Sequence, residues 1–144
     1  MKTFLILFSL LFLGQKSVAQ DWILVGSDSD GDKWYIKSSY VSKDDYGGGI
    51  KLWVKKEVKK TTIKKKGQSF TYINAKELQL LVADCSERKL KFVASTLYNS
   101  QGKVVNSWTI DDFEQEWRDV VPDSIGEIML EKICELMNWR TNGL

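Results

Sequence analysis

The hydrophobic pattern changes its period once along this chain of 144 residues, and that change constrains the fold more than any other feature. Upstream of Pro122, apolar residues tend to alternate with polar ones, as they do along half-buried β-strands. Downstream of Ser124 they recur every three or four residues, as they do on one side of an amphipathic helix. Strands followed by one helix predict an α+β domain, in which an antiparallel sheet of about six strands carries a C-terminal helix packed on one face.

Six segments carry the strand pattern, and polar turns such as Asn99–Gly102 separate them. Short turns between consecutive strands predict a meander, so the sheet should be antiparallel. Between Val58 and Lys76 the spacing fits neither period for long, so we expect the end of a strand plus a mobile hairpin loop closed near Gly67. The expected strands are Asp21–Gly26, Lys33–Lys37, Gly49–Val58, Lys76–Cys85, Lys89–Tyr98 and Lys103–Ile110.

A capping box marks the start of the predicted helix. The Ser124 hydroxyl is expected to accept a hydrogen bond from the Glu127 amide, and the Glu127 carboxylate to accept one from the Ser124 amide. We expect the helix to end around Asn138–Arg140, with Cys134 beside its apolar stripe. The stripe comprises Ile125, Ile128, Met129, Ile133, Leu136 and Met137.

Residues 1–19 have the pattern of a secretory signal peptide. Lys2 supplies a positive start, Phe4–Leu13 is almost wholly apolar, and Ser17-Val18-Ala19 suits a cleavage site. The apolar run is shorter than the roughly twenty residues of a membrane-spanning helix, although an uncleaved N-terminal anchor is the alternative. Since no cysteine stands near the cleavage site, we expect no lipoprotein anchor. Residues 20–144 should form one domain that is periplasmic or secreted and does not span the membrane.

Cys85 and Cys134 are the only cysteines in the chain. Export would place them in an oxidising compartment, where an even number of cysteines favours a disulfide. Two buried free thiols are the alternative. A metal site would need more soft ligands than two thiolates, and thiol-redox catalysis normally uses C-x-x-C spacing, which this pair lacks.

Composition excludes several classes of function. The chain has no histidine, which removes Ser-His-Asp and Cys-His catalysis and His-ligated metal sites. Removing residues 1–19 takes away Lys2 and Lys16, so 19 basic residues (21 minus 2) balance 19 acidic ones, and no nucleic acid partner is expected. No phosphate loop or nucleophile elbow is present, so we predict a non-enzymatic protein without a cofactor. The acidic residues of 111–116 and of the calcium-like turn at 28–32 are interpreted as solvated surface.

A lysine-dense segment is the strongest candidate for binding. Its charges suit an anionic glycan or an acidic region of an extracellular or envelope protein. The alternative is that these lysines only prevent aggregation at an exposed edge. Trp53 joins the candidates because it lies opposite the apolar face of Ile50, Leu52 and Val54, and a second apolar sheet face makes a homodimer plausible. The candidate lysines are Lys55, Lys56, Lys59, Lys60, Lys64, Lys65 and Lys66.

Several short elements, taken in order, resemble the surface-adhesin protein E-like family of exported bacterial proteins. They are Trp22, Trp34-Tyr35-Ile36, Leu52-Trp53-Val54-Lys55, Val82-Ala83-Asp84-Cys85, Lys89-Leu90-Lys91-Phe92, Tyr98, Gly102, Trp117, Val120-Val121-Pro122-Asp123-Ser124 and Cys134. The resemblance implies an antiparallel sheet with a C-terminal helix held against it by a Cys85–Cys134 bond. It also implies a non-enzymatic envelope or surface binding protein with an adhesin-like role. The alternative is a periplasmic structural or inhibitor-type protein without an adhesive role.

Overall fold

A computed structural model describes residues 21–43 and 48–142, and the predicted signal peptide at residues 1–19 lies outside the described residues. Two short 3-10 turns, η2 (Ser38–Tyr40) and η3 (Asp112–Glu114), interrupt the strands. The chain ends in one α-helix, α1 (Ile125–Asn142), two residues or more beyond the end expected from the sequence. The strands are β1 (Trp22–Ser27), β2 (Lys33–Lys37), β3 (Ser42–Lys43), β4 (Ile50–Lys65), β5 (Gln68–Asp84), β6 (Lys89–Tyr98), β7 (Val104–Thr109) and β8 (Trp117–Asp119).

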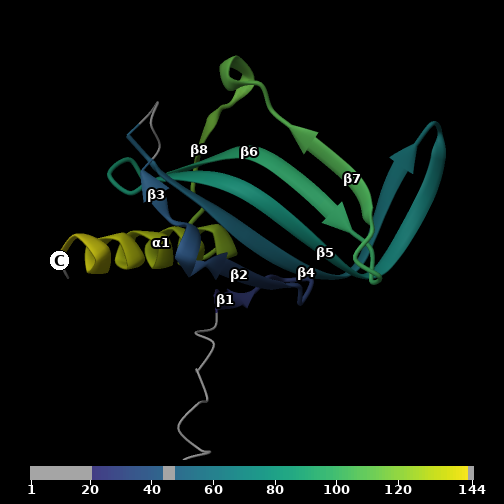
Figure 1. Cartoon of the computed structure of the whole chain (residues 1–144), viewed down its shortest axis with the longest axis horizontal. Helices are drawn as coiled ribbons and strands as arrows, with labels where there is room; N and C mark the ends of the chain where they lie inside the picture. Colours follow the sequence, from purple (N-terminus) through teal and green to yellow (C-terminus); the bar gives the residue numbers. More distant parts are fainter. Residues whose placement is uncertain (1–20, 44–47, 143–144) are drawn as a thin grey trace, which may run out of the picture.

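The strands form one open sheet in the order β1-β2-β4-β5-β6-β7, with α1 running across one of its faces (Figure 1). β3 pairs with β4 and β8 pairs with β6, so the sheet of the described residues has eight strands, two more than the six expected. The two additional strands are only two and three residues long, too short to show a period in the sequence. Every pairing is antiparallel, which confirms the predicted meander and the α+β architecture.

The lysine-dense segment is regular strand, so the prediction of a mobile loop there is wrong. β4 and β5 pair in a single register from Ile50 opposite Ala83 to Lys65 opposite Gln68, with a break only at Lys59 and Asn74, where Asn74 has φ of 52°. Their turn is Lys66-Gly67, whose φ values of 47° and 78° are those of a two-residue hairpin turn with both centres left-handed. Figure 1 shows this hairpin projecting beyond the rest of the sheet.

The core lies between the sheet and α1. Its largest fully buried side chains are Ile36, Leu52, Leu81, Leu130, Ile133 and Val54. Two details of the predicted helical stripe are wrong. Leu130, left out of the stripe, is 1% exposed, whereas Ile128 is 48% exposed. The helix contacts the sheet through Met129, Leu130 and Ile133, and this orientation turns Ile128 toward solvent.

A capping box fixes the start of the helix, and a disulfide fixes its middle. The Glu127 amide donates to Ser124 Oγ at 3.3 Å, as predicted, but Glu127 Oε2 accepts from the Asp123 amide at 2.8 Å and not from that of Ser124. Asp123 is left-handed, with φ of 58°, which brings its own amide to the carboxylate. Cys85 and Cys134 are bonded, which confirms the predicted disulfide between the end of β5 and α1. No helix among the described residues is long and apolar enough to cross a membrane.

Candidate functional site

Lys55 is held by its neighbours on the sheet face opposite α1, called here the helix-free face. Its Nζ lies 3.1 Å from Glu57 Oε1 and 3.9 Å from the centre of the Tyr35 ring. The Trp22 ring is 5.3 Å from the same nitrogen. The Lys55 ammonium is therefore occupied by a carboxylate and two aromatic faces, which limits its use for an external ligand.

Lys56 lies on the other face and fastens the turn between β1 and β2. Its Nζ is 3.1 Å from Asp28 Oδ2 and 3.1 Å from Asp32 Oδ2. Burial tends to raise the pKa of Asp28, but hydrogen bonds from Trp34 Nε1, Lys56 and the Asp32 amide lower it to about 2. The carboxylates of the calcium-like turn thus serve an internal ion pair. No group of acidic and cysteine side chains suited to a metal ion occurs in the described part of the chain.

Trp53 lies on the helix-free face and is half-buried there. Its neighbours Leu52 and Val54 point into the core, so strand alternation directs Trp53 to the opposite side. Leu80 of β5 stands directly across from it, and Ala94 of β6 follows Leu80 in the same row. The tryptophan therefore packs on apolar neighbours and presents only part of its surface.

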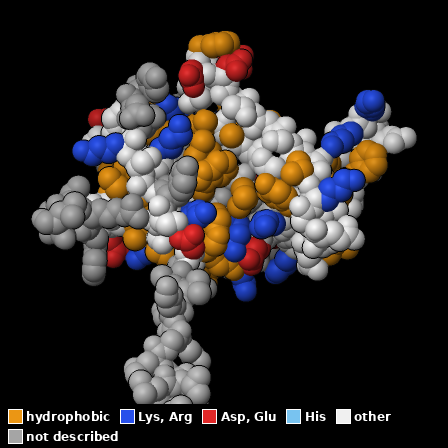
Figure 2. All heavy atoms as spheres, viewed as in Figure 1, with side chains coloured by type: hydrophobic (Ala, Val, Ile, Leu, Met, Phe, Trp, Pro, Cys, Tyr) orange, Lys and Arg blue, Asp and Glu red, His pale blue; other side chains and the backbone are white. Residues whose placement is uncertain are grey.

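The outer half of the hairpin carries the exposed lysines. Lys60, Lys64 and Lys66 are exposed, and within the described ranges none of them takes part in a hydrogen bond or ion pair of its side chain. Lys65 is also exposed but donates from Nζ to the backbone oxygen of Val105 in β7. Figure 2 shows lysines around hydrophobic atoms at this projecting end, where Phe70 and Ile73 are 40% and 63% exposed.

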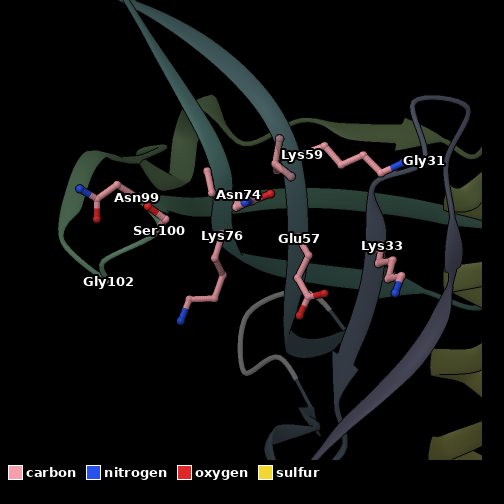
Figure 3. Close-up of a pocket in the computed structure, with 11 residues that line it drawn as sticks. Gly31, Lys33, Glu57, Lys59, Asn74, Lys76, Asn99, Ser100 and Gly102 are labelled. Atoms are coloured by element: carbon pink, nitrogen blue, oxygen red, sulfur yellow. The ribbon is translucent and has the colours of Figure 1, made fainter.

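A cavity of about 490 Å³ opens at the base of the hairpin. Figure 3 shows Glu57 between Lys33 and Lys76, with Lys59 extended toward Gly31. Strand register builds this row, because Lys33 of β2 faces Glu57 of β4, and Glu57 faces Lys76 of β5. The lining residues, called here the lysine cavity, are Gly31, Lys33, Glu57, Val58, Lys59, Asn74, Ala75, Lys76, Asn99, Ser100 and Gly102.

Three lysines of the lysine cavity outnumber its single carboxylate. Glu57 accepts a hydrogen bond from the Tyr35 hydroxyl at 2.8 Å and pairs with Lys55. Burial works to raise the pKa of Glu57, but these two partners outweigh it and hold that pKa below its ordinary value. Because Tyr35 and Lys55, which lie outside the cavity, bind Glu57, the positive charges of the three lysines outweigh the single negative charge in the cavity.

Lys59 is placed by the adjoining turn. Its amide donates to Asp32 Oδ1 at 2.9 Å, and its Nζ lies 2.5 Å from the position that a Cβ on Gly31 would take. Gly31 has φ of 76°, a conformation that L side chains rarely adopt. The absence of a side chain at Gly31 therefore leaves room for the Lys59 ammonium against the turn, at the wall of the cavity that both residues line.

The structure separates the predicted lysines into three groups. Lys55 and Lys56 stabilise the sheet, Lys59 lines the cavity, and the other four lie on the outer hairpin. Sequence reasoning missed Lys33 and Lys76, which join Lys59 only through the strand register. The sequence indicated their positions in part, because Lys33 is the first residue of one predicted strand and Lys76 is the first residue of another.

Comparisons with known proteins agree with this architecture. The family model of surface-adhesin protein E matches residues 22–135. A structure of Haemophilus influenzae protein E superposes with a TM-score of 0.55 at 14% identity, covering 82% of this chain and 86% of that one. Its crystal form II gives 0.54 at 12% identity, covering 82% and 90%. No curated protein sequence matches the chain. The match over most of the described sheet and helix shows that this chain belongs to the surface-adhesin protein E family.

Proposed function

We propose that this protein is an exported, non-enzymatic binding protein that holds an anionic glycan on the lysine cavity and the outer hairpin. One observation carries the proposal: Lys60, Lys64 and Lys66 are exposed beside a cavity with three further lysines, and in the described chain no carboxylate pairs with these hairpin lysines. Charges left unpaired in this way are available to an anionic partner.

Lysine chemistry favours a polyanion with repeated charged groups. An ammonium group is a point charge on a flexible stem, so it follows sulfates or carboxylates of variable spacing and does not need one bidentate geometry. The cavity adds hydrogen-bonding groups from Asn74, Asn99 and Ser100, which suit sugar hydroxyls. Since the predicted mature chain has no net charge, binding would depend on this local surface and weaken as salt rises.

Membership of an adhesin family supports an exported binding role. The proposal includes the absence of catalysis. It also includes a final location outside the cell or in the periplasm. The lack of histidine supports a non-enzymatic role, because it removes the usual general base near neutral pH. Pairing of two copies through the helix-free face, where Trp53 is partly exposed, stays a prediction that sedimentation of the oxidised protein would test.

Retention on immobilised heparin tests the glycan proposal. One variant neutralises the hairpin (Lys60, Lys64 and Lys66→Gln) and another the cavity (Lys33, Lys59 and Lys76→Gln). A matched control replaces Lys43, Lys89 and Lys132 by Gln, which removes the same charge elsewhere. We expect both test variants, and not the control, to elute at lower salt than the unmodified protein.

Equal elution of all three variants would contradict the proposal, because only net charge would then matter. An acidic protein as partner makes a different prediction. In that case the unmodified protein would bind an immobilised acidic polypeptide but not heparin, and the same two variants would lose this binding. Binding to neither matrix would favour the periplasmic structural or inhibitor-type alternative.

A further inference from the structure

A second cavity, of about 330 Å³, lies near the segment that joins β7 to β8 and shares no residue with the lysine cavity. Strand register places part of its wall, since Gln79 of β5 faces Ser95 of β6, and Ser95 faces Trp108 of β7. The lining residues, called here the acceptor cavity, are Gln79, Phe92, Trp108, Ile110, Glu114, Glu116 and Arg118.

Gln79 is a buried polar residue whose side-chain oxygen accepts no hydrogen bond within the described chain. Its side chain lines the acceptor cavity, the residue is 9% exposed, and its Oε1 has no hydrogen-bond partner there. The nearest hydroxyl in its row is already engaged, because Ser95 Oγ donates to Glu77 Oε1 at 2.5 Å. Buried polar atoms are nearly always hydrogen-bonded in proteins, so Gln79 points to a ligand that brings a donor.

Acidic and apolar side chains both line the acceptor cavity. Glu114 and Glu116 outnumber Arg118, and no ion pair joins these three side chains in the described part of the protein. Gln115 fixes the segment that presents them, because its Nε2 donates to the Ile110 carbonyl at 3.1 Å and to Asp112 Oδ1 at 2.9 Å. Trp108, which is 40% exposed, contributes an aromatic surface.

We propose that the acceptor cavity binds an alkylammonium group. The ammonium would donate to Glu114, Glu116 and the Gln79 oxygen, and three donors on one nitrogen match three acceptors. The indole face of Trp108 attracts a cation, and Phe92 and Ile110 would cover the apolar stem of the ligand. A free diamine and the lysine side chain of a partner protein share this chemistry. The proposal does not depend on glycan binding, because the two cavities share no residue.

Titration followed on the Trp108 indole tests the proposal. The oxidised protein is labelled with ¹⁵N-tryptophan, and the Trp108 N–H signal is assigned by its loss in Trp108→Phe. Cadaverine and a short peptide with one lysine and blocked termini serve as amine probes, and 1-pentanol serves as a neutral probe of similar length. We expect a saturable shift with either amine, or both, and none with 1-pentanol at equal concentration.

Two variants then separate the acceptors from general charge. Replacing Glu114 and Glu116 by Gln should weaken amine binding at least tenfold, and Gln79→Leu should also weaken it. Replacing Glu87 and Glu131 by Gln removes the same charge elsewhere and should leave binding unchanged. Tighter binding of the peptide than of cadaverine would identify a protein partner, and the reverse a free amine. Equal response to 1-pentanol, or unchanged affinity in the Glu114/Glu116 variant, would overturn the proposal.

Discussion

The Nζ atom of Lys56 lies 3.1 Å from Oδ2 of Asp32, a residue that is only 5% exposed. The same ammonium is 3.1 Å from Asp28 Oδ2 and 5.0 Å from the centre of the Trp34 ring. One lysine of β4 therefore fixes the turn between β1 and β2 to the neighbouring strand. A lysine that the sequence offers for ligand binding is instead part of the structure, because its partners are carboxylates with little access to water.

Lys56→Met should lower the free energy of unfolding by about 3 kcal/mol, since it leaves two poorly solvated carboxylates without their cation. Urea denaturation followed by tryptophan fluorescence would measure the change. Lys60→Met is the control, because Lys60 is exposed on the same strand, and we expect it to change stability by less than about 0.5 kcal/mol. Equal effects of the two substitutions would show that the ion pair contributes no more than a surface charge.

Stability should fall in acid partly through Asp28. Its pKa is lowered from 3.8 to about 2 in the folded protein, so the ionised form favours the folded state. This contribution is complete above about pH 4 and is lost as the pH falls to about 2. Asp28→Asn should therefore be less stable at pH 7, and its free energy of unfolding should fall less steeply between pH 4 and pH 2. Parallel curves for the two proteins over that range would contradict the assignment.

The Cys85–Cys134 bond closes a loop with a sequence separation of 49. Chain-entropy arguments give about 4 kcal/mol for a loop of this length, because the unfolded chain loses freedom when it is cross-linked. We expect the Cys85→Ser, Cys134→Ser double variant to lose about this much stability in urea. The reduced unmodified protein is the matched control and should unfold at the same midpoint. A double variant as stable as the oxidised protein would show that packing alone holds α1.

Most of the fold could be predicted from local signals. The Leu52/Val54 alternation identifies a strand, the Ser124–Glu127 box identifies a helix start, and the cysteines identify a tether. Each of these is a property of neighbouring residues or of simple chemistry. The prediction placed Ile128 in the buried stripe and left Leu130 out, whereas the structure shows the opposite. The hydrophobic spacing fits two adjacent lines along the helix, and only the position of the helix on the sheet selects one of them.

The candidate site could be predicted only in part, because it depends on pairing between strands. Lys59 was predicted from its segment, but its companions Lys33 and Lys76 follow from a register that no local signal fixes. The outer hairpin was predicted as a loop because residues of both its faces are exposed, which removes the alternation that marks a half-buried strand. The internal roles of Lys55 and Lys56 could not be predicted either. Their pairing with Glu57 and Asp32 is seen only in the folded sheet.

The hairpin turn offers a test of this corrected fold. Lys66 has φ of 47° and precedes Gly67, with φ of 78°, so a lysine occupies a left-handed position that asparagine or glycine adopts at lower cost. Lys66→Asn should raise the free energy of unfolding by about 0.5 kcal/mol, because it relieves this conformational cost without removing a hydrogen bond. Lys64→Asn, at a paired strand position opposite Ser69, removes the same charge and should instead be neutral or destabilising, because asparagine is disfavoured in strands. Urea denaturation of both variants would measure the difference, and a mobile loop in place of the turn would give the two substitutions the same small effect.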